Sequence, residues 1–236
     1  MNIVKPYARI LAFGETSGNP HGVILRGQEG YGIPLLRKIE FCGRISHRSE
    51  DAQTSDSWQR FIKAVVLDHG DWSITEHASV TCDFLVDRGI THELVRHRLM
   101  SFTQESTRFV NYEKKIPPSI IWPFPLPIEE THEAIRDHWV KAMAECEKAY
   151  KALLAYGVTP QIARSVFPNA LASRIIITAN LRSWRHVLIM RTTKESHPQM
   201  REVMIPLLQE FKDTIPLLYD DIEPNMKQSE AMKKAR

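Results

Sequence analysis

Three short stretches of the chain carry the hydrophobic patterns of β-strands. Residues 79–86 place Val, Cys, Phe and Val at every second position, and this period of two predicts a half-buried strand. Residues 8–13 form an apolar run that ends at Gly14, and residues 175–178 form a β-branched run typical of a buried strand. The sequence therefore predicts strands in three distant parts of the chain.

Longer stretches repeat hydrophobic residues every three or four positions, which is the spacing of an amphipathic helix. This spacing predicts helices at residues 34–41, 58–67, about 128–156, 182–191 and about 198–211. Gly157 is a stop signal for the third of these, and Thr159-Pro160 is typical of the start of another helix. A short helix from Thr91, as its N-cap, to His97 completes an α/β (α+β) pattern in which strands alternate with helices.

Prolines mark the most irregular part of the chain. Five prolines between residues 117 and 127 deny the segment regular hydrogen bonding and predict a stiff surface loop over 113–127. This loop is a candidate domain boundary, but the helix that follows it needs a partner surface for its apolar face. That face is predicted to contain Ile135, Trp139, Met143 and Leu153. We therefore expect a single domain over 1–236, with a frayed tail at 228–236.

The composition is that of a soluble globular protein. The 236 residues are 43% hydrophobic and 25% charged, which excludes a disordered, collagen-like or coiled-coil chain. No apolar run reaches the roughly 20 residues that cross a bilayer, and no signal-peptide core follows the first residues. We therefore expect a cytoplasmic protein without a membrane partner. The net charge of +3 is too small to indicate a nucleic-acid partner. The three cysteines form no CxxC pair, so neither a disulfide framework nor a cysteine zinc site is predicted.

A first cluster of arginines surrounds a polar loop. Arg96-His97-Arg98 is followed after seven residues by Ser106 and then by Arg108. Cations at the C-terminal end of a helix interact favourably with the helix dipole, and each stabilises the helix by about 0.3 to 1 kcal/mol. This explains the first three residues of the cluster, but it explains neither Arg108 nor the hydroxyls and amides before it. A planar guanidinium matches phosphate oxygens, and hydroxyl or amide groups can read a base or a sugar. The cluster therefore indicates a phosphorylated ligand.

A second cluster of cations lies in the C-terminal half of the chain, at Arg164, Arg174, Arg182, Arg185, His186 and Arg191. Arg182 and His186 share one face of the predicted helix at four-residue spacing. Ordinary surface exposure is the simpler explanation for Arg185. Arg174 and Arg191 adjoin apolar runs, so each is expected to need an anionic or carbonyl partner.

Two weaker patterns suggest other chemistry. His92 and His97 resemble the histidines of a zinc-protease helix, but they are five residues apart and do not share a face, so no metal site is predicted. Ser106 lacks the G-x-S-x-G turn of a nucleophilic serine, and a ligand-binding hydroxyl is favoured. His77 precedes the strand at 79–86, where a structural role and a place in a site are both open.

The spacing R-H-R, seven residues, S, one residue, R from Arg96 to Arg108 resembles the signature of the flavin-dependent thymidylate synthase (ThyX) family. The resemblance runs from about Ile39 to Leu208, with matching segments at 76–79, 92–95, 164–170 and 180–186. It implies a ThyX-like fold, with a central, mostly antiparallel sheet flanked by helices. It also implies the reductive methylation of dUMP to dTMP in a homotetramer with shared active sites. The carbon donor is then methylenetetrahydrofolate, a folate, and NADPH supplies the hydride by way of FAD.

The resemblance also assigns roles to residues at matching positions. Contacts to FAD are implied for Ser79, Arg96, His97, Arg98, Gln104, Asn180, Leu181, Arg182 and His186. Contacts to dUMP are implied for Glu93, Arg96, Gln104, Glu105, Ser106, Thr107, Arg108, Arg164 and Arg191. His77 matches a family histidine near the flavin and folate, and it is implied in catalysis together with Arg191. Arg174 stays a candidate only because it adjoins an apolar run.

Arg191 matches the family arginine that favours ionisation of the uracil ring at N3. A fixed guanidinium beside the ring stabilises negative charge that develops there, which activates C5 without an enzyme thiolate. None of the three cysteines lies in the Pro-Cys-His setting of the cysteine-dependent thymidylate synthase. Other members can carry Gln, Glu and Tyr where this chain has Glu93, Gln104 and Phe109.

Two alternatives compete with this interpretation. A non-catalytic RNA- or nucleotide-binding module could use the same basic loop with Trp184 and Phe102 as stacking surfaces, although the helical spacing places Trp184 on the buried face. A flavoenzyme of the same fold could instead act on another pyrimidine nucleotide. A flavin spectrum and an assay of dUMP conversion distinguish these functions.

Overall fold

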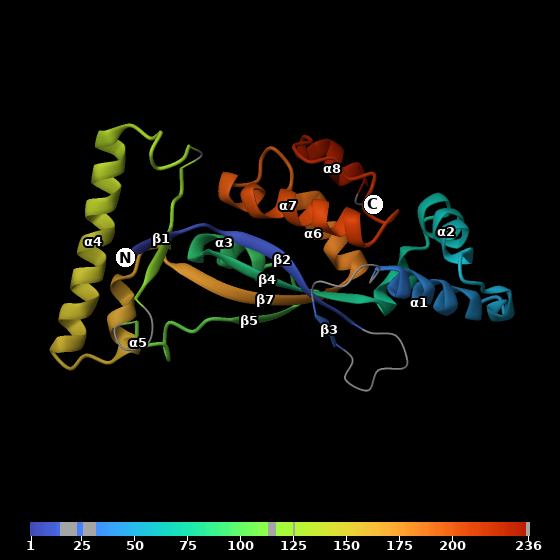
Figure 1. The fold of residues 1–236 in the computed structure, drawn as a ribbon, viewed down its shortest axis with the longest axis horizontal. Helices are drawn as coiled ribbons and strands as arrows, with labels where there is room; N and C mark the ends of the chain where they lie inside the picture. The colour runs from blue at the N-terminus through green and yellow to red at the C-terminus, as the bar shows by residue number, and fades with distance from the viewer. Residues whose placement is uncertain (15–22, 26–31, 113–116, 125, 235–236) are drawn as a thin grey trace. The chain divides into compact units, whose positions relative to one another are not determined.

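The computed structural model describes residues 1–14, 23–25, 32–112, 117–124 and 126–234. Parts of the proline-rich loop predicted over 113–127 lie outside these residues. No helix among the described residues is long and apolar enough to cross a membrane. The chain mixes strands and helices throughout, as the hydrophobic patterns predict (Figure 1).

Among the described residues, seven strands form two sheets. A five-stranded sheet has the order β3-β2-β4-β7-β5, and β1 pairs in parallel with β6 in a separate two-stranded sheet. Within the larger sheet β2 and β3 are antiparallel, with Phe13 opposite Ile24. The strands are β1 (Asn2–Val4), β2 (Tyr7–Gly14), β3 (Val23–Leu25), β4 (Ser79–Asp87), β5 (Ser101–Gln104), β6 (Ser119–Ile121) and β7 (Ala172–Asn180). Three of them, β2, β4 and β7, contain the strands predicted from the sequence.

Eight α-helices and four segments of 3-10 or π helix occur in the described part of the chain. The α-helices are α1 (Gly32–Ile45), α2 (Ser57–Phe61), α3 (Arg88–Leu94), α4 (Glu133–Ala155), α5 (Pro160–Ala163), α6 (Leu181–Arg191), α7 (Pro198–Thr214) and α8 (Gln228–Lys234). The others are the 3-10 segments η1 (Glu50–Ala52), η3 (Trp72–His77) and η4 (Arg164–Val166) and the π-helical segment η2 (Ile62–Asp68). The helix predicted over 58–67 is therefore α2 continued by η2.

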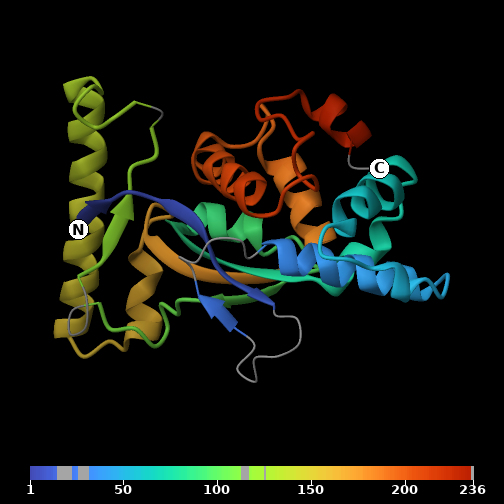
Figure 2. The same ribbon diagram turned by 45° about the vertical axis from the view of Figure 1, so that its right-hand side comes forward.

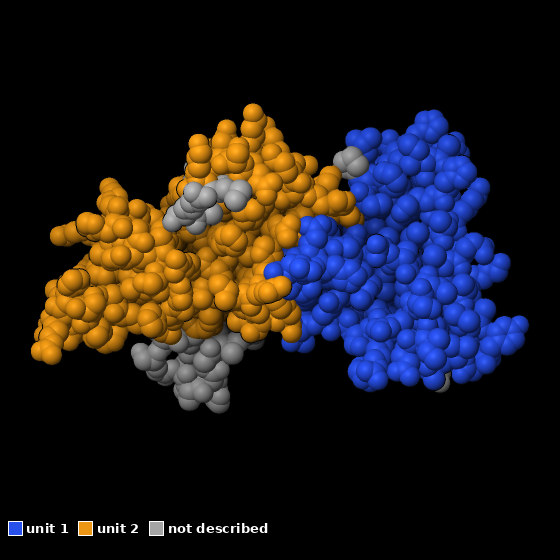
Figure 3. All heavy atoms as spheres, turned by 180° about the vertical axis from the view of Figure 1, so that it is seen from behind, with its two compact units in different colours: residues 1–7, 84–96, 103–175 blue, residues 8–83, 97–102, 176–236 orange. Residues whose placement is uncertain are grey.

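The chain divides into two compact units, shown in different colours in Figure 3. Unit 1 consists of residues 1–7, 84–96 and 103–175, and unit 2 consists of residues 8–83, 97–102 and 176–236. The single-domain organisation stays a prediction.

The core of unit 2 is built around α6. The Trp184 side chain is fully buried, and its indole Nε1 donates a hydrogen bond to the carbonyl of Val80 on β4, 2.9 Å away. Phe211 of α7 packs against the same indole ring at 5.5 Å between centroids. Helices α7 and α8 both contact α6 and lie beside it in two views (Figures 1 and 2). The apolar face of α6 is therefore buried, as its spacing predicts.

The core of unit 1 is an aromatic cluster under α4. The rings of Tyr150 and Phe167 stack at 4.3 Å between centroids, and Tyr112 packs edge-on against both. The N-terminal half of α4 differs from the prediction, because Ile135 is 48% exposed rather than buried. Tyr150 is the buried residue of α4. Trp139 of the N-terminal half still packs edge-on against Trp122 at 4.9 Å between centroids, and the helix also contacts η4 and α5.

Two further boundaries differ from those predicted. Helix α3 begins at Arg88 instead of after Thr91, because the Asp87 carboxylate caps it by accepting a hydrogen bond from the backbone N–H of Ile90. The tail expected to fray at 228–236 forms α8 over Gln228–Lys234. Its first N–H is bound by the Glu195 carboxylate, and Ala231 is buried, so side-chain capping and packing hold this end of the chain.

Candidate functional site

The predicted site residues separate between the two units. Unit 1 holds most of the residues implied for dUMP, which are Glu93, Arg96, Gln104, Glu105, Ser106, Thr107, Arg108 and Arg164. Unit 2 holds most of those implied for FAD and catalysis, which are His77, Ser79, His97, Arg98, Asn180, Leu181, Arg182, His186 and Arg191. Each unit therefore contains its own group of predicted site residues.

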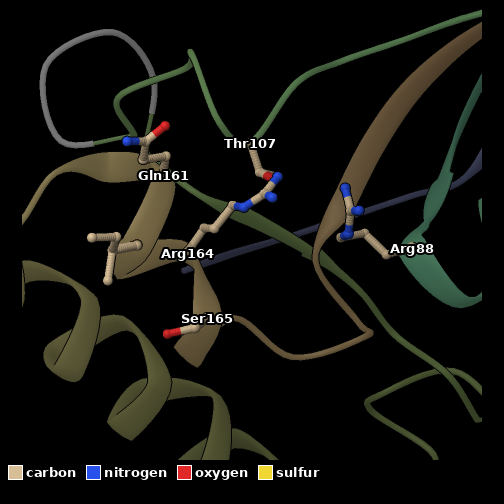
Figure 4. Close-up of a pocket in the computed structure, with 6 residues that line it drawn as sticks. Arg88, Thr107, Gln161, Arg164 and Ser165 are labelled. Carbon is tan, nitrogen blue, oxygen red and sulfur yellow. The ribbon is translucent and has the colours of Figure 1, made fainter.

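A pocket of about 430 Å³ in unit 1 brings together the segment after β5 and the helical turns α5 and η4. Its lining residues are Arg88, Thr107, Gln161, Ile162, Arg164 and Ser165 (Figure 4). The volume lies within the range of small-molecule sites, and the lining contains two arginines and no carboxylate. The pocket therefore has the charge and size for an anionic small molecule.

Thr107 and Arg164 form the centre of this pocket. Arg164 Nη1 donates a hydrogen bond to Thr107 Oγ1 at 3.1 Å. Thr107 is only 4% exposed, and its hydroxyl oxygen serves as the acceptor in that bond. The hydroxyl hydrogen donates to no described residue, so it is available to a ligand oxygen.

Gln104 and Glu105 anchor the loop that leads into the pocket. Gln104 Nε2 donates hydrogen bonds of 3.0 Å to the hydroxyls of Thr91 and Ser173. Glu105 Oε1 accepts a hydrogen bond of 2.7 Å from the hydroxyl of Tyr112. Burial, with the Glu105 carboxylate beside it, raises the pKa of Tyr112 far above its usual value, so this phenol stays protonated as a donor. Both side chains therefore fix the position of the loop.

Ser106 and Arg108 lie in the turn that follows. Ser106 Oγ accepts a hydrogen bond from the backbone N–H of Arg108, and the Ser106 carbonyl accepts from the N–H groups of Phe109 and Val110. Arg108 Nε donates to Gln161 Oε1 at 3.1 Å. The exposed Arg108 side chain is thereby linked to a residue of the pocket.

Glu93 and Arg96 lie at the end of α3. The backbone N–H of Arg96 donates to the Glu93 carbonyl at 3.2 Å, which closes the last turn. The Arg96 side chain is exposed and Glu93 is half-buried. The helix end therefore presents a guanidinium to solvent and a carboxylate closer to the interior of unit 1.

In unit 2 the last residue of α6 contacts the middle residue of the R-H-R motif. Arg191 Nε donates a hydrogen bond to His97 Nε2 at 2.9 Å. Burial, chiefly, together with the nearby charge of Arg191 and the ring of His186, lowers the pKa of His97 to about 4. A neutral His97 is the form that can accept this hydrogen bond. The charge of Arg191 thus helps to keep His97 neutral, and the neutral His97 can in turn accept the hydrogen bond from Arg191.

Exposed donors surround this pair. The ring of His186 lies edge-on to His97 at 6.4 Å between centroids, and it is exposed one turn before Arg191. Arg182 is also exposed and pairs with Glu76 at 2.7 Å. Arg98 is exposed and has no hydrogen bond or ion pair to any described residue. These side chains can donate to phosphate oxygens of a cofactor.

His77 and Ser79 occupy the entry to β4. His77 is the exposed last residue of η3. Ser79 packs so closely against Gly14 of β2 that a methyl group at Gly14 would collide with the Ser79 hydroxyl. Glycine at position 14 is therefore required for the present position of Ser79.

Asn180 and Leu181 form the start of α6. Asn180 Oδ1 caps the helix by accepting from the N–H of Ser183 at 2.8 Å. The backbone N–H of Leu181 donates to Ala78, its carbonyl accepts from the hydroxyl of Tyr219, and its side chain is buried. Both residues fix the helix from which Arg182 and His186 project.

One expectation for an arginine is wrong. Arg185 is not a surface residue, because it is 8% exposed, binds both carboxylate oxygens of Asp221 at 2.7 Å and stacks over Trp72. Arg174 is an exposed residue of β7, although Ile175 beside it is buried. The side chains of a strand alternate between its faces, so an apolar neighbour does not imply burial.

The sequence interpretation missed four residues of the pocket, Arg88, Gln161, Ile162 and Ser165. Arg88 belongs to neither cluster of cations. Gln161 and Ser165 flank the predicted Arg164, and α5 and η4 bring them to the same pocket. Their positions close to Arg164, in a predicted helix, could have indicated that they lie near the same site.

Comparisons with known proteins identify a family for this chain. A family model described as thymidylate synthase complementing protein matches residues 35–217, most of the chain. The chain belongs to this family. The flavin-dependent thymidylate synthase of Corynebacterium efficiens is 34% identical over 223 residues, covering 88% of this chain and 87% of the relative. The one of Mycobacteroides abscessus is 32% identical over 207 residues, covering 81% and 80%.

A solved structure supports the fold of this thymidylate synthase family member. The UMP/dUMP methylase PolB from Streptomyces cacaoi, bound with 5-Br dUMP, matches with a TM-score of 0.71 at 21% sequence identity. The match covers 93% of this chain and 96% of that chain. The family predicted from the R-H-R motif is therefore confirmed, as is the predicted antiparallel sheet flanked by helices.

Proposed function

We propose that the chain is a flavin-dependent thymidylate synthase that methylates dUMP to dTMP. Methylenetetrahydrofolate is the carbon donor, and NADPH supplies the hydride through FAD. The active enzyme is a cytoplasmic homotetramer with shared active sites. Family membership over residues 35–217 and curated relatives named for this activity support the proposal.

The unit 2 constellation fits FAD. Arg98, Arg182 and His186 are exposed, and each offers N–H donors of the kind that bind a pyrophosphate. Asn180 and Leu181 hold α6 in place by capping and by backbone hydrogen bonds, and Ser79 lies at the entry to β4. FAD, when bound, supplies the redox chemistry of hydride transfer.

The unit 1 constellation fits a nucleotide monophosphate. Arg164 and Thr107 present a guanidinium and a hydroxyl hydrogen to the pocket, and Arg108 is linked to its wall through Gln161. Guanidinium groups bind phosphate oxygens in a planar, charge-assisted geometry. We assign this pocket to the phosphate of dUMP, with Ser106 and Glu105 in the adjoining loop.

The observation that carries the proposed chemistry is the hydrogen bond between Arg191 and His97. Because His97 is neutral and accepts from Nε, it holds the guanidinium of Arg191 in one orientation while leaving its charge uncompensated by that bond. A fixed positive charge beside the uracil ring stabilises negative charge at N3 and activates C5. The chain thereby activates the pyrimidine without a thiolate.

UMP is a second candidate substrate. The solved structure that shares the fold is described as a UMP/dUMP methylase. The two nucleotides share the uracil ring and the phosphate, so the Arg191 and Arg164 contacts serve both. Only a contact to the 2′ position can distinguish them.

A flavin spectrum combined with NADPH oxidation tests the proposal. The purified protein is expected to bind FAD and to oxidise NADPH faster when dUMP is present, with UMP and dCMP as comparison substrates. A larger stimulation by UMP than by dUMP would assign the chain to UMP methylation. A protein that neither retains nor binds flavin would contradict both candidates. An R60Q variant, which changes an exposed arginine of α2, is the control.

A further inference from the structure

Arg88 faces Arg164 across the pocket of unit 1. Figure 4 shows the two side chains extending toward each other from different elements, Arg88 from the start of α3 and Arg164 from η4. Arg88 does not belong to the R-H-R motif or to the second cluster of cations. The folded structure, and not a sequence motif, therefore identifies Arg88 as a residue of the pocket.

The guanidinium of Arg88 acts electrostatically on Tyr112, whose phenol is uncharged. It makes no hydrogen bond or ion pair to a described residue, and its backbone N–H donates to Asn169 and Leu171 independently of the side chain. Arg164 is bonded there only to the neutral hydroxyl of Thr107. Two cations that face one pocket repel each other until an anion lies between them.

The remaining lining residues favour an anion with several oxygen atoms. Thr107 is 4% exposed and has a hydroxyl hydrogen to donate, and Ser165 supplies a second hydroxyl. A phosphate monoester offers enough acceptor oxygens for two guanidinium groups and a hydroxyl at once. A nucleoside without a phosphate has no such group.

We propose that Arg88 is a second phosphate-binding residue of the substrate site, opposite Arg164. This inference rests on the proposed binding of dUMP and extends it to a residue outside the family motif. Arg88 contributes affinity through the phosphate and makes no contribution to the recognition of uracil. The enzyme therefore discriminates between dUMP and deoxyuridine partly through this side chain.

Calorimetric titration of the full-length protein tests the proposal with three ligands, dUMP, deoxyuridine and FAD. R88Q is expected to weaken dUMP binding about tenfold and to leave the Kd for deoxyuridine and FAD within twofold of wild type. R88K is expected to weaken dUMP binding less than R88Q, because it keeps the charge and loses the planar fork. R60Q should match wild type for all three ligands. Circular dichroism verifies the fold of each variant. If R88Q is unstable, the dUMP affinity of R88K tests the proposal in its place.

Three results would overturn the inference. Wild-type dUMP affinity in both Arg88 variants would show that the side chain does not touch the phosphate. Equal weakening of dUMP and deoxyuridine would assign Arg88 to the base or to the fold of the pocket. Weakening of FAD without weakening of dUMP would assign the pocket to the cofactor. A wild-type protein that binds no dUMP would instead refute the proposed function itself, and the Arg88 assignment with it.

Discussion

Arg191 and His97 are 94 positions apart in the sequence, yet Nε of the arginine donates a 2.9 Å hydrogen bond to Nε2 of the histidine. The pair joins the end of α6 to the R-H-R motif within unit 2. The bond requires a neutral imidazole, and burial together with Arg191 and His186 provides one by lowering the pKa of His97 to about 4. The orientation of the proposed catalytic guanidinium therefore depends on the protonation state of a neighbour.

The first prediction concerns the titration of His97. Its imidazole should titrate near pH 4, and in R191Q the midpoint should rise toward 6.5 without reaching it, because burial remains the largest cause of the shift. NMR of nitrogen-labelled histidine measures both midpoints. The unfolded chain binds this proton near pH 6.5, so the contribution of His97 to stability is complete above that pH and is lost as the pH falls toward 4. An ordinary midpoint in the wild type would refute the neutral pair.

The second prediction concerns the hydrogen bond from Tyr112 to Glu105. Y112F removes the 2.7 Å bond that anchors the loop before the pocket and should destabilise the protein by about 1–2 kcal/mol. Affinity for dUMP should fall as well, because Ser106 and Thr107 follow directly in that loop. Denaturant unfolding and dUMP titration measure the two effects. Y156F is a matched control, since Tyr156 is 87% exposed. Equal losses in the two variants would show that the bond has no special role.

The third prediction separates a structural arginine from the proposed catalytic one. R185Q loses the paired bonds to Asp221 and the bond to the Leu218 carbonyl, and should lower the unfolding free energy by about 2–3 kcal/mol. R191Q should unfold within about 1 kcal/mol of wild type while losing activity. Thermal unfolding of both variants provides the comparison. A stable R185Q, or an R191Q that fails to fold, would reverse the roles assigned to these two residues.

The sequence predicted β2, β4, β7 and the longer helices, because their hydrophobic residues repeat at clear periods, but it did not predict β5, which leads into the pocket. The burial of Val80 and Trp184 follows directly from those periods. The start of α3 was predicted wrongly at Thr91, because Asp87 is the residue that caps the helix. Side-chain capping depends on the local backbone angles, and the hydrophobic period does not reveal them.

The site was predictable only where a motif marks it. Arg96 to Arg108 form a recognisable pattern, but Arg88 and Gln161 reach the pocket through the packing of separate elements. Arg185 was misjudged because its partner Asp221 lies 36 residues away and carries no signal of its own. Long-range ion pairs of this kind depend on tertiary structure, which a local pattern of residues does not specify.

The most direct test of the account follows the labelled carbon of methylenetetrahydrofolate in the presence of dUMP, FAD and NADPH. Wild-type protein should place the label in the C5 methyl group of dTMP, and R191Q should retain its flavin absorbance while forming almost no labelled product. A wild-type enzyme that oxidises NADPH but yields no labelled dTMP, or an R191Q variant with normal yield, would contradict the central role given to this arginine.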